Sequence, residues 1–296
     1  MVSASQYCAF SHFSEMLDRT GVDWWLSMWE VYFDDSATTD WVAAACYVAS
    51  STQWAEFTRG LKLLSASEGF TDFHMTDLAA GGGEFRDWSK LKRSRVYSAM
   101  AALIRSNVEH GFALAFRKSD YDTYIPEYIK KDLGYQHYPV GVDFLMGKFM
   151  EWRIKDPNRE SVQYIFDRSP KGKNIRTEIQ RIEDNIRQVP GEIERFGLSE
   201  DGFSEQSKSV FIPLQAADVL AWQWSHFIVA ERGTEGTGDF YDRSQMAELF
   251  EAGRYECGWI EGENFRKWAE DVYAHESEGA TSAFLASRPV DSRKKL

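Results

Sequence analysis

The sequence predicts an α/β protein in which helices cover a central β-sheet. Short runs of β-type residues alternate along the chain with longer segments whose apolar residues recur at helical spacing, and this alternation is typical of α/β domains. The run at residues 162–166 is almost continuously apolar, which indicates a strand buried on both faces. Hydrophobic residues make up 43% of the 296 residues and aromatic residues 15%, enough to fill a substantial core.

The expected strands are short runs of aromatic, apolar and β-branched residues. They lie at residues 29–34 (WEVYFD), 41–50 (WVAAACYVAS), 111–116 (GFALAF) and 161–167 (SVQYIFD). The first and the last of these end in an aspartate. Residues 71–78 are predicted as a short strand or turn, and the glycine-rich segment that follows them as a flexible loop without the GK[ST] of a phosphate-binding loop.

The expected helices are recognised by caps and by apolar spacing. A helix over about residues 52–64 opens after Ser50 and Ser51, which are residue types that cap helices. Four isoleucines at helical spacing predict an amphipathic helix over 174–189. Apolar spacing also predicts helices over 87–108, 139–154, the segment around 214–228, and 262–275.

These elements divide the chain into three parts. Residues 1–28 are predicted as a helical N-terminal lead-in, residues 29–231 as the α/β domain, and residues 232–296 as a helical or irregular C-terminal extension. The polar stretch between the helix of 174–189 and residue 210 is expected to be hairpin-like.

Composition bears on location and partners. No stretch reaches the roughly 18 uncharged apolar residues of a membrane helix, and the first residues lack the pattern of a secretion signal. The three cysteines are far apart in sequence, which favours a reducing cytoplasm over a disulfide scaffold. A net charge of −12 argues against coating nucleic acid by bulk electrostatics, but it is compatible with an enzyme that gathers carboxylates around metal ions.

Asp218 is the only acidic residue of the segment VFIPLQAADVLAWQWSHF, residues 210–227. On a helical projection from Leu214, at about 100° per residue, Asp218 lies at the edge of the apolar face at about 40°. Gln215 and Ser225 border the same polar strip. A carboxylate there needs a cation or hydrogen-bond donors, because its unpaired burial costs several kcal/mol. A backbone N–H or an arginine would satisfy it as well as a metal ion.

Asp34 and Asp167 each end a predicted strand, at the edge of an α/β sheet where ligands gather. Asp35 follows Asp34 directly, so in a continued strand the two side chains point to opposite faces, and we favour Asp34 as the member of a site. Ordinary turns would explain both strand ends equally. Together with Asp218, the two aspartates would suit Mg²⁺ or Mn²⁺, which prefer oxygen ligands.

Four short motifs resemble the family called domain of unknown function 3800. They are VYFDDSATTD, FHMTDL, YIFDRS and PLQAADVLAW, which occur in the family's order between about residues 29 and 230. The resemblance implies a ribonuclease-H-like mixed central sheet flanked by helices. It also implies Asp34, Asp167 and Asp218 as catalytic metal ligands with His74 nearby. Asp35 stands where that family often has Glu, and either Asp72 or Asp77 would supply a fourth acidic group.

Three further assignments remain open between function and structure. His74 would ligate a metal or transfer protons, or it would be a hydrogen-bonded core residue. Gln215 would orient Asp218 or contact substrate, or it would satisfy buried backbone. The basic residues that follow the strand of 161–167 would bind substrate phosphates or belong to a solvated surface; they are Arg168, Lys171, Lys173 and Arg176.

The leading hypothesis is a Mg²⁺- or Mn²⁺-dependent enzyme that hydrolyses phosphodiester bonds in nucleic acid. The alternative is a non-catalytic binding or scaffold protein in which the acids are structural. Hydrolysis of a small phosphoester is a third option. In each case we expect a cytoplasmic protein with no membrane partner.

Overall fold

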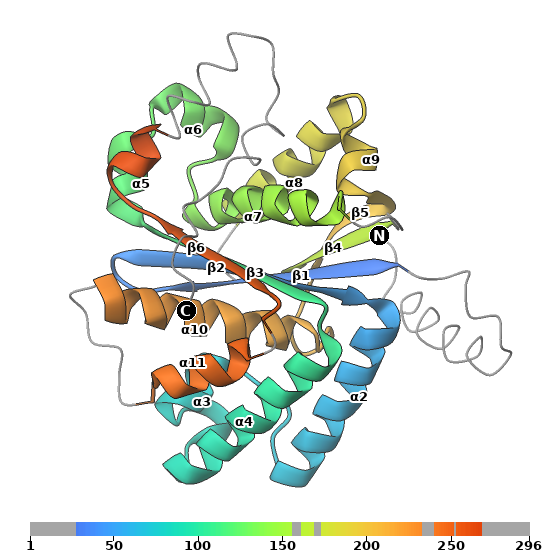
Figure 1. The fold of residues 1–296 in the computed structure, drawn as a ribbon, viewed down its shortest axis with the longest axis vertical. Helices are drawn as coiled ribbons and strands as arrows, with labels where there is room; N and C mark the ends of the chain where they lie inside the picture. The colour runs from blue at the N-terminus through green and yellow to red at the C-terminus, as the bar shows by residue number, and fades with distance from the viewer. Residues whose placement is uncertain (1–27, 156–160, 169–172, 233–239, 252, 268–296) are drawn as a thin grey trace, which may run out of the picture.

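The structure is a computed structural model that describes residues 28–155, 161–168, 173–232, 240–251 and 253–267. It is an α/β fold in which one six-stranded sheet lies between two layers of helices (Figure 1). The predicted fold class is confirmed at this level. The helical lead-in predicted for residues 1–28 lies outside the described residues, apart from residue 28.

The sheet has the strand order β5-β4-β1-β2-β3-β6. Its strands are β1 (Trp29–Ala37), β2 (Trp41–Ser50), β3 (His110–Arg117), β4 (Val162–Asp167), β5 (Leu198–Gln206) and β6 (Tyr255–Ile260). β2 pairs antiparallel with β1 and with β3, whereas the other neighbours pair in parallel. β1, β4 and β5 therefore present their carboxyl ends at the same edge of the sheet.

One layer of helices packs around α10 (Figure 1). It contains α2 (Ser51–Glu68), α3 (Met75–Ala80), α4 (Lys90–Asn107), α10 (Leu214–Arg232) and α11 (Arg243–Phe250), with a single 3-10 turn at Gly83–Phe85. α10 lies between β1 and β2 on one side and α3 and α11 on the other. Most of its residues are buried as a result, including all of the positions from Leu214 to Ser225.

The opposite face of the sheet is covered by helices around α7 (Figure 1). They are α5 (Lys118–Tyr124), α6 (Glu127–Leu133), α7 (His137–Arg153), α8 (Lys173–Gln188) and α9 (Glu192–Phe196). Side chains alternate between the two faces along each strand, so Tyr32 belongs to the core under α10 and Phe33 to the core under α7.

The start of α2 follows the sequence prediction. Ser50 is its N-cap: the Ser50 hydroxyl accepts a hydrogen bond from the Gln53 N–H, and the Gln53 side chain accepts one from the Ser50 N–H. This reciprocal capping box satisfies two of the amide groups that a helix start leaves free.

The C-terminal prediction was wrong in one respect. Residues 232–296 were expected to be helical or irregular, but β6 joins the sheet beside β3, in parallel register from Gly111 with Tyr255 to Phe116 with Ile260. β6 is an edge strand with only Gly258 and Ile260 buried, so its sequence lacks a clear apolar period. Of the helix predicted over 262–275, residues 263–267 are helical and residues 268–275 lie outside the described residues.

Two further segments bear on the prediction. Residues 71–78 were expected to be a short strand or turn; residues 71–74 form a turn, and α3 follows it from Met75. The stretch expected to be hairpin-like contains α9 and then β5, which pairs in parallel with β4. The sequence of β5 is polar and resembles that of a loop. The reason is that β5 lies at the sheet edge, where only Leu198 and Gly202 of this strand are buried.

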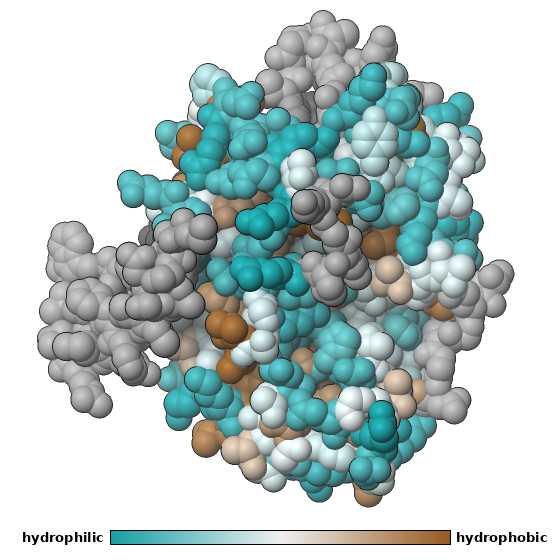
Figure 2. Space-filling view, turned by 180° about the vertical axis from the view of Figure 1, so that it is seen from behind, coloured by the Kyte–Doolittle hydropathy of each residue, from teal (hydrophilic) through white to brown (hydrophobic). Residues whose placement is uncertain are grey.

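The surface carries no single apolar face among the described residues in view. Figure 2 shows a mainly hydrophilic surface with scattered hydrophobic residues. The exposed large hydrophobic side chains include Leu63 on α2, Leu91 on α4 and Ile193 on α9, which are on separate elements. No helix in the described ranges is both long and apolar enough to span a membrane.

Candidate functional site

Asp34 and Asp167 lie side by side where β1 runs past the end of β4. The prediction that Asp34 ends its strand was wrong: β4 ends at Asp167, but β1 continues to Ala37 because it stays paired with β2. Phe33 pairs with Phe166 in the parallel register of these strands, and the two rings stack with centroids 4.8 Å apart in the core under α7. Asp34 and Asp167 are the next residues along, so alternation turns both carboxylates to the other face, toward α10. Asp34 is 2% exposed and Asp167 is half-buried.

Asp218 approaches the same place from the second turn of α10. Its side chain is buried because α10 packs directly on β1 and β2. The carboxylate is hydrogen-bonded on both oxygens: Oδ2 accepts from the Met75 N–H at 2.6 Å, and Oδ1 accepts from the Lys208 ammonium at 3.0 Å. Both kinds of partner that the sequence left open, a cation and a backbone donor, are therefore present.

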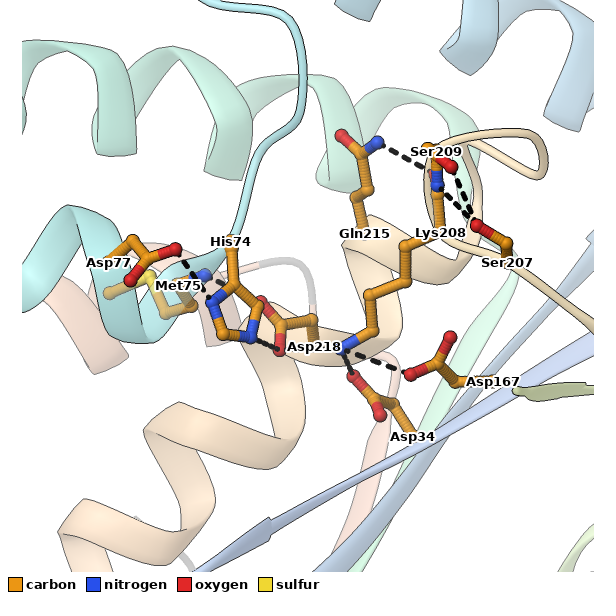
Figure 3. Close-up of polar contacts among 10 residues, drawn as sticks. All are labelled: Asp34, His74, Met75, Asp77, Asp167, Ser207, Lys208, Ser209, Gln215 and Asp218. Carbon is orange, nitrogen blue, oxygen red and sulfur yellow. Dashed lines mark hydrogen bonds and ion pairs between the residues drawn. The ribbon is translucent and has the colours of Figure 1, made fainter. Parts of the chain in front are cut away.

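Lys208 lies at the centre of the three aspartates (Figure 3). Its Nζ is 2.5 Å from Asp34 Oδ2, 3.0 Å from Asp218 Oδ1 and 3.7 Å from Asp167 Oδ2. The contact with Asp34 is close enough for an ion pair but poorly aligned as a hydrogen bond, so we treat it as an ion pair. We call Asp34, Asp167, Asp218 and Lys208 the carboxylate–lysine cluster.

Burial and mutual charge act differently on the members of this cluster. Desolvation raises the pKa of Asp34 well above its ordinary value; nearby Lys208 opposes this shift and Asp218 adds to it. Desolvation also raises the pKa of Asp167. It acts in the same direction on Asp218, but Lys208, His74 and the Met75 N–H outweigh it and hold the pKa of Asp218 below its usual range. Burial favours neutral Lys208, yet the three carboxylates raise the pKa of Lys208 above its ordinary value.

Gln215 connects the segments on either side of the cluster. Its Oε1 accepts a hydrogen bond from the Phe73 N–H at 3.1 Å, and its Nε2 donates to the Lys208 carbonyl at 2.9 Å. The amide therefore satisfies buried backbone, which was one of the two roles that the sequence allowed. In doing so it fixes the backbone of Lys208 relative to the residue that precedes His74.

His74 lies beside the cluster and is not a core residue. Its side chain is 42% exposed, its Nε2 is 3.7 Å from Asp218 Oδ1, and its Nδ1 is 3.2 Å from Asp77 Oδ2. Of the two candidate acids near His74, the structure brings Asp77 to the imidazole. Asp72 is held elsewhere in the loop, where its N–H donates to Glu84 at 3.0 Å.

Asp35 faces the other side of the sheet, as the alternation predicts. Burial raises the pKa of Tyr138, a buried residue of α7, and the charges of Asp35, Asp34 and Asp167 add to this shift. The alternation of β1 therefore directs the Asp35 side chain away from the face on which Asp34 meets Lys208.

Of the basic residues predicted to bind substrate, Arg168 and Arg176 have described side chains, and both contact Glu205 rather than the three aspartates. Arg168 is exposed at the end of β4, and its Nη2 donates to the Glu205 carbonyl at 3.1 Å. Arg176 is on the surface and pairs with Glu205. Lys171 lies outside the described residues, and so does the side chain of Lys173.

Sequence reasoning missed Lys208, the basic residue that does contact the aspartates. It lies in a polar stretch, SEQSKS, that carries no motif and precedes α10 by a few residues. The hydrogen bond between its carbonyl and Gln215 of α10 holds it in place beside the aspartates, and this contact is tertiary. Its place ten residues before Asp218 was the one available signal, and that spacing alone does not define a site.

The donor set of the cluster fits a hard divalent cation. Three carboxylates that approach one point supply oxygen ligands of the kind Mg²⁺ and Mn²⁺ prefer. Their oxygens are arranged around an ammonium group, at distances longer than the roughly 2.0–2.1 Å of Mg–O bonds. Accordingly, no group of three or more His, Cys, Asp or Glu side chains within the described ranges already has metal-binding geometry.

Comparison of the chain with models of known protein families gives no match. Comparison with curated proteins gives no match either.

Proposed function

We propose that this protein is a ribonuclease-H-like hydrolase that uses Mg²⁺ or Mn²⁺ to cleave phosphodiester bonds in nucleic acid, in the cytoplasm. The observation that carries the proposal is the convergence of Asp34, Asp167 and Asp218 on one ammonium group, that of Lys208. These residues come from two adjacent strands and one helix, and they meet beside the carboxyl end of β4, at the sheet edge where α/β proteins bind ligands.

The topology supports the fold part of the proposal. Strands β3, β2, β1, β4 and β5 are adjacent in that order, and β2 is the antiparallel member. A mixed sheet of this order, flanked by helices, agrees with the ribonuclease-H-like fold that the sequence motifs imply.

Each residue would have a defined role in this chemistry. Asp34 would bridge the bound ions, while Asp167 and Asp218 would complete their coordination. Bound divalent ions would activate water and stabilise the leaving oxygen. His74, oriented by Asp77 and with its Nε2 adjacent to Asp218, would transfer protons from its partly exposed imidazole.

Cleavage assays with the purified full-length chain test the proposal. Single- and double-stranded DNA and RNA would be incubated with Mn²⁺, with Mg²⁺ or with a chelator, and we expect cleavage only with metal. Asp34→Asn and Asp167→Asn should reduce cleavage to background. His74→Ala should lower its rate by about 10²–10⁴-fold, as expected for loss of a general acid–base. Asp201→Asn, at an exposed position on β5, is the matched control.

Undiminished cleavage by Asp34→Asn would show that the carboxylates are not the catalytic group. One observation favours the alternative, a non-catalytic binding or scaffold protein: Lys208 already supplies a counter-charge to the three acids. For such a protein we expect no metal-dependent cleavage, and any binding of nucleic acid should persist in the presence of a chelator.

A further inference from the structure

The carboxylate–lysine cluster contains a cation contributed by the chain itself. Lys208 Nζ lies within 4 Å of an oxygen from each of the three aspartates that we propose as metal ligands. A lysine in this position has the same electrostatic effect as a bound cation, because it relieves the repulsion between carboxylates that share a buried site.

The ammonium group and a divalent cation would compete for the same oxygens. The close contacts of Lys208 use Asp34 Oδ2 and Asp218 Oδ1, two of the oxygens that a shared ion would need. A Mg²⁺ ion requires oxygen at roughly 2.0–2.1 Å, and two cations at such short distances from the same oxygens would repel each other. Binding of one therefore requires departure of the other.

Lys208 can leave without a change in the fold. Its carbonyl is held by Gln215, so the backbone is fixed, but the ammonium group is at the end of a flexible four-carbon stem. The side chain is 18% exposed, and two residues further on Val210 is 67% exposed. The cluster therefore borders solvent on the side from which Lys208 enters.

We propose that Lys208 is an internal competitor for the divalent cation: its ammonium group neutralises the three aspartates until a cation binds, and the cation then displaces it toward solvent. This inference rests on the proposed function, because it concerns the same three carboxylates. It adds a regulatory property: Lys208 raises the concentration of divalent cation that is needed to occupy the site.

Metal titration tests the competition directly. Mn²⁺ would be titrated into wild type, Lys208→Met and Lys92→Met, with heat release as the readout. Removal of the competitor should tighten Mn²⁺ binding by about tenfold or more, because the cation no longer has to break the lysine contacts. Lys92→Met is the matched control, since Lys92 is also partly buried but pairs with Glu68 and packs on Trp88. Adding Asp34→Asn to Lys208→Met should remove the gain.

Amine labelling of the unmutated chain provides a second readout that does not depend on a variant folding correctly. The reactivity of Lys208 toward an acylating reagent, measured by mass spectrometry, should rise when Mn²⁺ is added. The reactivity of Lys92 should stay the same.

The outcomes separate this inference from the proposed function. If wild type binds Mn²⁺ through Asp34 but Lys208→Met binds it no more tightly and labelling does not change, the competition is wrong and the metal site stands. If neither protein binds Mn²⁺, the competition by Lys208 and the proposed metal site are both rejected. If only Lys208→Met binds Mn²⁺, Lys208 excludes the cation and is not displaced by it, so both the displacement and metal-dependent catalysis by the natural chain are rejected.

Discussion

The carboxylate of Asp218 accepts a hydrogen bond from the Met75 N–H, with 2.6 Å between Oδ2 and N. Met75 is the first residue of α3, and His74, which precedes it, provides no side-chain cap. Asp218 therefore satisfies a free amide at the start of one helix from within another, while its second oxygen pairs with Lys208. This is how an otherwise apolar helix accommodates a buried acid: every oxygen has a donor.

We predict opposite effects on stability from two neutralising substitutions. The pKa of Asp218 is lowered, so its ionised form contributes stability that is present above its ordinary pKa and lost as the pH falls through the lowered one. Asp218→Asn should therefore lower the free energy of unfolding at pH 7 by about 1–3 kcal/mol. The pKa of Asp34 is raised, so its ionised form is unfavourable at pH 7 and Asp34→Asn should leave the free energy of unfolding equal or higher.

Urea denaturation at pH 7 without added metal measures both changes, and Asp201→Asn is the exposed control. Strong destabilisation by Asp34→Asn would contradict this prediction. It would show that the ion pair between Lys208 and Asp34 stabilises the protein by more than the desolvation of the Asp34 carboxylate costs.

We predict a pH-dependent effect at Asp143 on α7. Burial raises the pKa of Asp143 to about 6, against the opposing effect of Arg181. Its contribution to stability is present below its ordinary pKa and is lost as the pH rises through about 6. Asp143→Asn avoids this loss. The free energy of unfolding of the variant should therefore exceed that of wild type by little at about pH 4 and by about 2 kcal/mol at about pH 7.5. Denaturant titrations at the two pH values provide the comparison, and a difference independent of pH would reject it.

We predict a steric effect at Gly141, where α7 crosses β2. A Cβ at Gly141 would lie 2.6 Å from the Ala44 Cβ, and neither group can move without moving backbone. Gly141→Ala should lower the free energy of unfolding by about 1–2 kcal/mol despite the better helix propensity of alanine.

Gly60 on α2 is the matched control for Gly141. A Cβ at Gly60 would meet the end of the flexible Leu103 side chain, so Gly60→Ala should be close to neutral. Thermal unfolding of both variants makes the comparison, and Ala44→Gly should partly rescue Gly141→Ala. Equal effects of the two glycine substitutions would show that the α7–β2 contact is not tight.

The projection of α10 shows where sequence reasoning reached its limit. It placed Asp218, Gln215 and Ser225 on a polar strip at the edge of the core face, and all three are buried. The strip contacts protein on both sides because α3 and α11 cover the side of α10 that faces away from the sheet. A helix buried between two layers has no solvent face, so periodicity identifies the helix but not its partners.

The sequence by itself determined four strands of the sheet, the helices with clear caps or apolar spacing, and the candidate acids. The isoleucines of α8 are buried or half-buried as their spacing requires, and Ser50 caps α2, because such features depend on near neighbours in the chain. The acidic ends of two predicted strands likewise identified Asp34 and Asp167, and the register of β1 with β4 places them side by side although β1 continues to Ala37. Only the tertiary structure decided that Lys208 lies among the aspartates and that Asp77 contacts His74. The contacts of Lys208 with Asp34 and Asp167 join segments that are distant in sequence, so they form only when β1, β4 and the segment before α10 have packed together. The contact of Asp77 with His74 is local, but no period in the sequence selected Asp77 over Asp72.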